Sequence, residues 1–322
     1  MDKTVERLLL EPALSWKLAV NLLGKGMDSP EARRAASEVR QAPLVQALIA
    51  TCDRRHGAYK KWDGAHWVLS MLADLGYPAG DETLRPLMEE TYATWLSTEH
   101  ETRGLRVIDG RVRRCASQEG NAVWFSLRLG LADGRTDELV NRLLQWQWPD
   151  GGWNCSKHPE ADTSSFMETL IPLRALALYA GVSGDARAKA AAERAAEVFL
   201  TRRLFKRRRD GQVINHRFIL LHYPLYWHYD ILFGLKVLAE AGMLGDPRCL
   251  AALDLLESKR LPDGGFPAEE SYAHRTRPQL SGYSPVSWGG TSRKTMNPFV
   301  TADALYVLRM AGRFSVSLPD AV

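Results

Sequence analysis

The feature that most constrains this chain is the stretch Gln147-Trp-Pro-Asp-Gly-Gly-Trp153, which follows an apolar helical run. A glutamine amide offers two donors and one acceptor, and an indole offers one donor and a large flat face. Such a pair can close one helix end and pack on the next helix, while the two glycines turn the chain sharply. Weaker copies occur at 260–266 and 53–59. Turns of this kind, each between helical runs, predict a repeat architecture.

Helical periodicity runs through the chain, and strand signals are scarce. The segment 163–181 is apolar nearly all round, as expected of an inner helix that is packed on both sides. The next segment, 186–204, has an alanine-rich face and a charged face, as expected of an outer helix that is half exposed to solvent. The chain therefore predicts alternating inner and outer helices.

The same alternation recurs along the sequence. Further inner helices are expected at 66–76, 121–130, 228–238 and 300–308, and further outer helices at 82–97, 136–147 and 247–259. A sixth inner helix is expected from the segment 12–24 or from the pair at 30–52. Glycines that predict the C-caps of the inner helices are Gly76, Gly130, Gly181, Gly242 and Gly312.

The Gln147–Trp153 stretch resembles the QW repeat of squalene and oxidosqualene cyclases. Their α/α-toroid group also includes the β subunits of protein prenyltransferases and the thioester domains of complement proteins. The copy at 260–266 keeps Gly264 and an aromatic residue but lacks the glutamine. The resemblance implies a single all-α toroid domain over 1–322, built from about five or six helical hairpins. An open solenoid of the tetratricopeptide kind is the alternative, but its 34-residue period is too regular for the spacing here.

Composition excludes some classes of protein. The chain has 322 residues, 25% charged residues and a formal net charge of +4, which is ordinary for a soluble globular protein. It has no apolar run long enough for a transmembrane helix and no signal-peptide core at its start, and its four cysteines are scattered. We therefore expect a cytoplasmic protein with reduced thiols.

One segment, Arg202–Arg209, concentrates the positive charge. It could contact a diphosphate, a nucleic acid or an anionic membrane surface, or it could be a solvated helix end.

Closing the ring would bring the N-termini of the inner helices together at one mouth of a central cavity. Polar and aromatic side chains are dense at these positions, although capping alone explains some of the acids. The residues expected to line the cavity are His66, Trp67, Asn121, Trp124, Tyr226, His228 and Asp303.

An isoprenoid substrate is the leading prediction, because aromatic rings stabilise carbocations and a buried carboxylic acid can protonate an alkene. Asp162 would be the acid. The resemblance is incomplete here, since the Asp-x-Asp-Asp and Asp-Cys-Thr-Ala-Glu motifs of the cyclases are absent and Glu160-Ala-Asp-Thr163 is the nearest match. A terpenoid-cyclase or prenyltransferase-like enzyme is therefore expected. A partner subunit is also possible, since prenyltransferase β subunits work with an α subunit.

A zinc site is the second possibility, because prenyltransferase β subunits hold zinc with an Asp, a Cys and a His. Cys155 and His158 have a Cys-x-x-His spacing beside Asp162, and Cys115 begins the preceding repeat. Thiolate, imidazole and carboxylate would suit zinc. The alternative is a buried thiol and a surface histidine. The cluster 222–230, which ends in His228 and Asp230, could supply a general base or could simply pack.

Other functions remain open. The Cys115-Ala-Ser-Gln118 spacing resembles a complement-type thioester but lacks the flanking residues. A glycan hydrolase or lyase would need paired carboxylates, with Glu168 and Asp230 or Asp162 and Asp303 as candidates. A non-catalytic binding or scaffolding toroid is the third alternative. Two long insertions, at 98–118 and 262–297, could be lids over a site.

Overall fold

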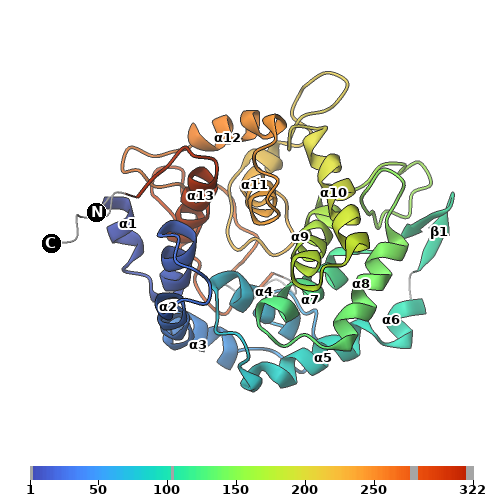
Figure 1. Ribbon diagram of the computed structural model, residues 1–322, viewed down its shortest axis with the longest axis horizontal. Helices are drawn as coiled ribbons and strands as arrows, with labels where there is room; N and C mark the ends of the chain where they lie inside the picture. Colours follow the sequence, from blue (N-terminus) through green and yellow to red (C-terminus); the bar gives the residue numbers. More distant parts are fainter. Residues whose placement is uncertain (1–2, 103–104, 276–281, 317–322) are drawn as a thin grey trace.

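The computed structural model describes residues 3–102, 105–275 and 282–316. Helices dominate these residues and form two concentric layers around a common centre (Figure 1). The inner helices are α4 (Ala65–Leu75), α7 (Ser117–Arg128), α9 (Phe166–Ser183), α11 (Ile231–Glu240) and α13 (Pro298–Met310). The outer helices are α2 (Pro30–Gln41), α3 (Pro43–Ala50), α5 (Arg85–Trp95), α8 (Gly134–Trp146), α10 (Ala186–Leu200) and α12 (Leu250–Glu257). The predicted α/α toroid is confirmed.

Short elements complete the described chain. They are α1 (Lys3–Leu8), α6 (Thr98–Thr102), the π-helical segment η2 (Lys17–Leu22), and the 3-10 turns η1 (Pro12–Leu14), η3 (Glu82–Leu84), η4 (His216–Ile219) and η5 (Pro247–Cys249). A small hairpin, β1 (Arg106–Ile108) with β2 (Arg111–Arg113), lies in the 98–118 insertion. No helix of the described residues is both long and apolar enough to cross a membrane.

The sixth inner position is filled by η2, within the segment 12–24. It packs on α13, and its buried Lys17 reaches Asp74 of α4 at 2.7 Å and Asp303 of α13 at 2.8 Å. The first and last parts of the chain therefore meet and close the ring. This closure distinguishes the fold from an open solenoid, whose repeats contact only their neighbours.

A buried ion network holds the centre of the ring together. Lys236 of α11 bridges Asp74 and Asp303 at 2.6 and 2.9 Å, and Arg174 of α9 contacts Asp74 at 3.2 Å. Arg174 also pairs with Glu240 at 2.5 Å. Counting Lys17, the network among the described residues joins three cations to three carboxylates from η2, α4, α9, α11 and α13. This balance offsets the large desolvation cost of burying each charge.

Four inner helices end as the glycines predicted. Gly76, Gly130, Gly242 and Gly312 have φ between 63° and 81°, and in each case the next amide donates back across the last turn, as Tyr77 N does to Leu72 O at 3.0 Å. These are the bonds of a Schellman cap. The prediction for Gly181 is wrong: α9 continues to Ser183 and ends at Gly184, with φ of 75°.

The turn at Gln147 joins α8 to the segment before α9 and touches α10. The Gln147 amide donates to the carbonyls of Gly151 and Ala191, each at 2.8 Å. Gly151 has φ of 98°, and a Cβ atom there would collide with the carbonyl of Arg194. At the second copy the guanidinium of Arg260 donates to Gly264 O at 3.1 Å. Arginine therefore replaces the missing glutamine with an equivalent bond, and the repeat is preserved in structure.

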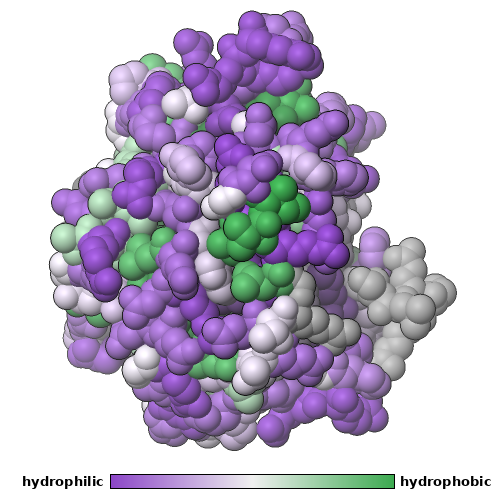
Figure 2. Space-filling model, turned by 90° about the vertical axis from the view of Figure 1, so that its right-hand side faces the viewer, coloured by the Kyte–Doolittle hydropathy of each residue, from purple (hydrophilic) through white to green (hydrophobic). Residues whose placement is uncertain are grey.

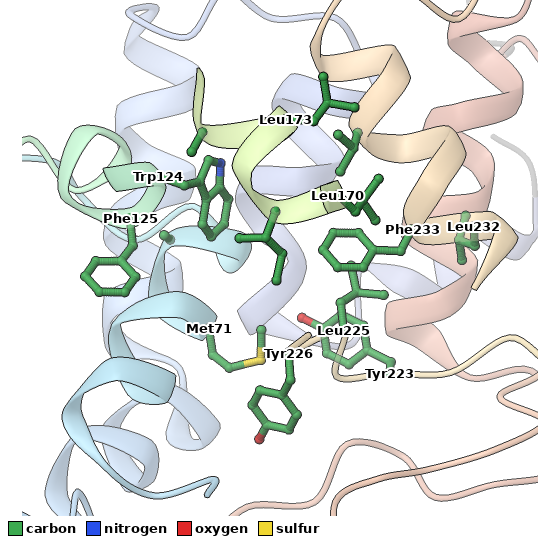
Figure 3. Packing of buried hydrophobic residues seen from close by; sticks show 14 of the residues in the cluster. Met71, Trp124, Phe125, Leu170, Leu173, Tyr223, Leu225, Tyr226, Leu232 and Phe233 are labelled. Atoms are coloured by element: carbon green, nitrogen blue, oxygen red, sulfur yellow. The ribbon is translucent and has the colours of Figure 1, made fainter. Parts of the chain in front are cut away.

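Side chains fill the part of the ring interior that Figure 3 shows. Figure 3 shows Met71 of α4, Trp124 of α7 and Leu170 of α9 directed toward a common interior, with Tyr223 and Leu225 entering from the loop before α11. Both loop residues are buried. The outer surface differs: the face in Figure 2, on the side of β1 and α8, is mostly hydrophilic with small separate hydrophobic patches.

Candidate metal centre

Two thiols and a carboxylate meet at the N-terminal ends of α7 and α9. The potential ligand atoms of Cys115, Cys155 and Glu168 all lie within 4.8 Å of one another. Cys115 comes two residues before α7, Glu168 lies in the first turn of α9, and Cys155 lies between the Gln147 turn and α9. The residues come from adjacent repeats, so the toroid fold itself assembles the group.

Backbone contacts fix the segments that carry the cysteines. Arg113 and Asn154 form a parallel bridge, and Arg114 N donates to Asn154 O at 3.3 Å. These contacts set the two cysteine-bearing segments side by side. The helices behind them are also close, because a Cβ atom at Gly120 of α7 would lie 2.9 Å from the backbone nitrogen of Pro172 in α9. A glycine is required at this crossing.

Glu168 is positioned from both sides. One carboxylate oxygen accepts a bond from Ser117 N at 3.1 Å, and the other lies 3.6 Å from the Cys155 sulfur. The neighbouring Thr169 hydroxyl accepts from Trp153 N at 3.1 Å. Since Trp153 ends the Gln147 turn, that turn ties Cys155 to the first turn of α9 and so determines where the thiol lies.

The pKa values of all three groups in the cluster are shifted from their ordinary values. Burial, followed by the charge of Cys155, raises the pKa of Glu168 to about 8. The hydrogen bond with Cys155 and burial hold the pKa of Cys115 far above its ordinary value. The hydrogen bond from Cys115 lowers the pKa of Cys155 to about 6. Three acidic groups therefore crowd a space that favours one thiolate and opposes further negative charge.

The donor chemistry fits a soft or borderline divalent cation. Two thiolates and one carboxylate are ligands that zinc accepts, and three protein ligands leave a fourth tetrahedral position open, as in catalytic zinc sites. A dication would favour the ionised forms of Glu168 and Cys115, which burial and the neighbouring groups oppose. We conclude that these residues could hold zinc.

An aromatic wall adjoins the cluster. The ammonium group of Lys61 lies 4.8 Å from the ring centroid of Trp227 and 5.1 Å from that of Trp62. Burial lowers the pKa of Lys61, while the charges of Cys115 and Glu168 act to raise it. His228 stacks on Tyr272, with ring centroids 3.4 Å apart. The wall thus combines stacked aromatic rings with one cation.

The structure separates the residues of the predicted zinc set. Cys155 belongs to the cluster, but His158 and Asp162 are exposed and lie outside the group of potential ligand atoms found among the described residues. Asp162 precedes α9 in a surface loop instead of facing the interior. Glu168, predicted as a carboxylate of a catalytic pair, is the buried member that faces the thiols.

The other predicted acids have structural contacts of their own. Asp230 caps α11 by accepting from Phe233 N at 2.8 Å, and it contacts His222 at 2.6 Å. Asp303 belongs to the central ion network. Asp162 is at the surface while Asp303 is fully buried, so that predicted pair is not assembled.

The predicted cavity residues divide between two places. His66 and Trp67, in the first turn of α4, pack in a buried aromatic cluster, and Tyr226 stacks on Trp62 with centroids 4.2 Å apart. Asn121 is buried in α7, and its amide nitrogen has no partner among the described residues. Trp124 lies elsewhere, against Arg174 at 3.6 Å, on a cavity near the C-terminal ends of the inner helices.

Sequence reasoning noted Cys115 as the start of the preceding repeat but did not place it among the ligands, and it missed Lys61. A usable signal existed for Cys115, because it lies two residues before the inner helix α7. The segment Arg202–Arg209 forms a turn after α10, in which Arg207 and Arg209 pair with Asp210 at 3.3 and 3.2 Å. Its charge is therefore partly neutralised.

Comparison with known proteins finds likeness only among solved structures. No family model and no curated protein matches this chain. The unsaturated glucuronyl hydrolase of Bacillus sp. GL1, which acts in glycosaminoglycan degradation, is 15% identical, with a TM-score of 0.46 over 93% of this chain and 84% of that one. A family 76 glycoside hydrolase from a bovine Bacteroides thetaiotaomicron strain is 12% identical, with a TM-score of 0.46 over 94% of this chain and 68% of that one.

Proposed function

We propose that Cys115, Cys155 and Glu168 bind zinc and that the chain is a metal-dependent enzyme whose reaction occurs at this site. The observation that carries the proposal is the convergence of three potential ligand atoms within 4.8 Å, from adjacent repeats. When bound, zinc would act as a Lewis acid toward a substrate atom in the open fourth position. The protein would supply the ligands and a partly dehydrated site.

An isoprenoid, or its diphosphate, is the substrate class that we propose. Trp227, His228 and Tyr272 are half-buried and stack in a row with His228 in the middle, and their exposed parts would contact an apolar chain. The ammonium group of Lys61 lies over the ring of Trp227, 4.8 Å from its centroid, and would supply a positive charge for an anionic head group. The apolar and charged groups together support an amphipathic substrate of this kind.

A glycan substrate is the second candidate, because aromatic side chains such as these also contact sugar rings. Hydrolysis of a glycosidic bond ordinarily needs two carboxylates across the bond. Glu168 is one buried carboxylate at the site, whereas Asp230 is used as a helix cap and Asp162 is exposed. A glycan hydrolase at this site would therefore need a second carboxylate that neither predicted pair supplies.

Turnover assays with zinc-loaded protein test the proposal. The substrates are geranylgeranyl diphosphate, with and without a peptide thiol, and unsaturated and saturated oligosaccharides. We expect consumption of the prenyl compound by the wild type and by Cys249→Ser, whose thiol is buried under α12. Cys155→Ser and Glu168→Gln should lose the activity.

Each outcome separates the parts of the proposal. Turnover of an oligosaccharide would show that the substrate is a glycan and not an isoprenoid. No turnover by a protein that binds zinc stoichiometrically would support a metal-stabilised binding toroid and refute the catalytic role. Full activity in Glu168→Gln would show that the reaction does not need the Glu168 carboxylate.

A further inference from the structure

A separate cavity lies at the opposite ends of the inner helices. It has a volume of about 310 Å³, at the small end of the range for ligand pockets. Its lining comes from the C-terminal halves of α4, α7, α9, α11 and α13 and from the segment 16–27. The thiol–carboxylate cluster lies at the N-terminal ends of α7 and α9, so the two sites share helices but not residues.

Cations dominate the polar lining of this cavity. They are Arg128, Arg174, Lys236 and Arg309, against the carboxylates of Asp74 and Glu240. Both carboxylates are already bound, since Asp74 pairs with Lys236 and Arg174, and Glu240 is held by Arg174 through two bonds of 2.5 and 2.7 Å.

Two guanidinium groups therefore face the cavity without an ion pair. Within the described ranges no carboxylate oxygen lies within 4.0 Å of either Arg128 or Arg309. Arg309 donates to the carbonyl of Asn21 at 3.0 Å, and Arg128 contacts the sulfur of Met27 at 3.9 Å. Each guanidinium has five donors, so most of their donors are left for another acceptor.

Unpaired carbonyls at the helix ends do not explain these cations. The last turns of α4, α7, α11 and α13 are closed by backbone amides, for example Leu131 N to Ser126 O at 2.9 Å and Met243 N to Leu238 O at 2.8 Å. The remaining helix dipole is weak beyond the last turn. Two guanidiniums without an ion pair, at a concave and half-buried wall, instead suit an anionic group, which arginine binds through paired hydrogen bonds.

Aromatic and apolar side chains form the rest of the wall. The guanidinium of Arg128 lies 4.8 Å from the ring of Trp16, and that of Arg174 lies 3.6 Å from the ring of Trp124. Leu178, Val237 and Tyr306 also line the space. The cavity thus joins a cationic corner to an apolar surface.

We propose that this cavity binds a small organic anion, with its carboxylate or phosphate group on Arg128 and Arg309 and its apolar body against Trp16 and Trp124. The proposal is independent of the metal centre, because none of these residues belongs to the thiol–carboxylate cluster. Loss of zinc binding would leave it standing.

Calorimetric titration of the full chain tests the proposal with hexyl phosphate, hexanoate, inorganic phosphate and uncharged hexanol as probes. We expect binding of hexyl phosphate or hexanoate, weaker binding of inorganic phosphate and none of hexanol. The choice between the two hexyl anions shows which head group the cavity takes. Arg128→Met and Arg309→Met should each weaken binding about tenfold or more, since each removes a charged hydrogen bond.

Arg313→Met is the matched control. Arg313 lies just after α13 and pairs with Asp254 and Glu257 at 2.7 and 3.0 Å, outside the cavity. We expect this variant to bind like the wild type. No binding by the wild type, unchanged binding in both Arg128→Met and Arg309→Met, or equal weakening in Arg313→Met would each overturn the proposal. Melting temperatures of the variants identify any loss that comes from unfolding.

Discussion

Removing one charge from the central ion network should destabilise the whole toroid. The carboxylate of Asp74 forms ion pairs with Lys17 at 2.7 Å, Lys236 at 2.6 Å and Arg174 at 3.2 Å. It also accepts a hydrogen bond from the Tyr223 hydroxyl at 3.1 Å. Burial opposes the charged form, but the surrounding cations hold the pKa of Asp74 well below its ordinary value. Asp74→Asn keeps the size of the side chain and leaves three cations with two carboxylates.

The expected cost follows from the burial of every partner. Breaking a buried pair by removing one partner costs about 3–5 kcal/mol, because it leaves an uncompensated charge. For 322 residues the entropy of unfolding is roughly 0.7 kcal/mol per kelvin, so the melting temperature should fall by about 4–7 °C. The matched control is Asp254→Asn, since Asp254 is 67% exposed and its pair should contribute about 1 kcal/mol or less.

A double variant separates charge balance from simple damage. Lys17→Met with Asp74→Asn removes one cation and one anion, and Met keeps most of the apolar length of lysine. We expect the double variant to be more stable than Asp74→Asn alone in urea unfolding followed by circular dichroism. A double variant that loses the sum of both single effects would refute the reasoning that the network is held by charge balance.

Two further predictions concern the fold. Burial lowers the pKa of His66 to about 3, so between pH 6.5 and 3 the unfolded chain binds a proton at His66 that the folded chain does not, and stability falls as the pH falls. From pH 7.5 to 5 this lowers the free energy of unfolding by about 2 kcal/mol. In urea unfolding at both pH values, His66→Gln should therefore lose about 2 kcal/mol less stability than the wild type. An equal loss in the two proteins would contradict the assignment. Gln147→Ala removes the bonds to Gly151 and Ala191 and should lower the free energy of unfolding by about 1–3 kcal/mol. Arg260→Ala at the second copy removes one such bond and should cost less. An unchanged chemical denaturation midpoint in Gln147→Ala would show that the turn does not need its amide.

The ring could be predicted from sequence because its signals are local. Inner helices are apolar all round, outer helices have one charged face, and the C-cap glycines end four of the inner runs. The sixth inner position was less visible, because η2 is short and carries a lysine. That lysine is buried only because Asp74 and Asp303, 57 and 286 residues away, arrive beside it.

The site was predicted less well because helix starts decide which side chains face the mouth. Sequence patterning began an inner helix at 121, whereas α7 begins at Ser117. Trp124 is therefore seven residues into the helix, about 10 Å from its start, and faces the other cavity. The partner of Cys155 was sought among close neighbours in sequence, but the crossing of α7 and α9 at Gly120 brings Cys115 and Glu168 to it instead.

Metal content measures the central claim most directly. The wild type and Cys249→Ser, purified without chelator and dialysed, should each hold about one zinc per chain by mass spectrometry of the elements, while Cys115→Ser and Cys155→Ser should lose most of it. Replacement by cobalt should then give thiolate-to-metal absorption bands in the wild type that weaken in either cysteine variant. A wild type without metal after zinc loading, or equal metal in all four proteins, would contradict a metal centre at Cys115, Cys155 and Glu168.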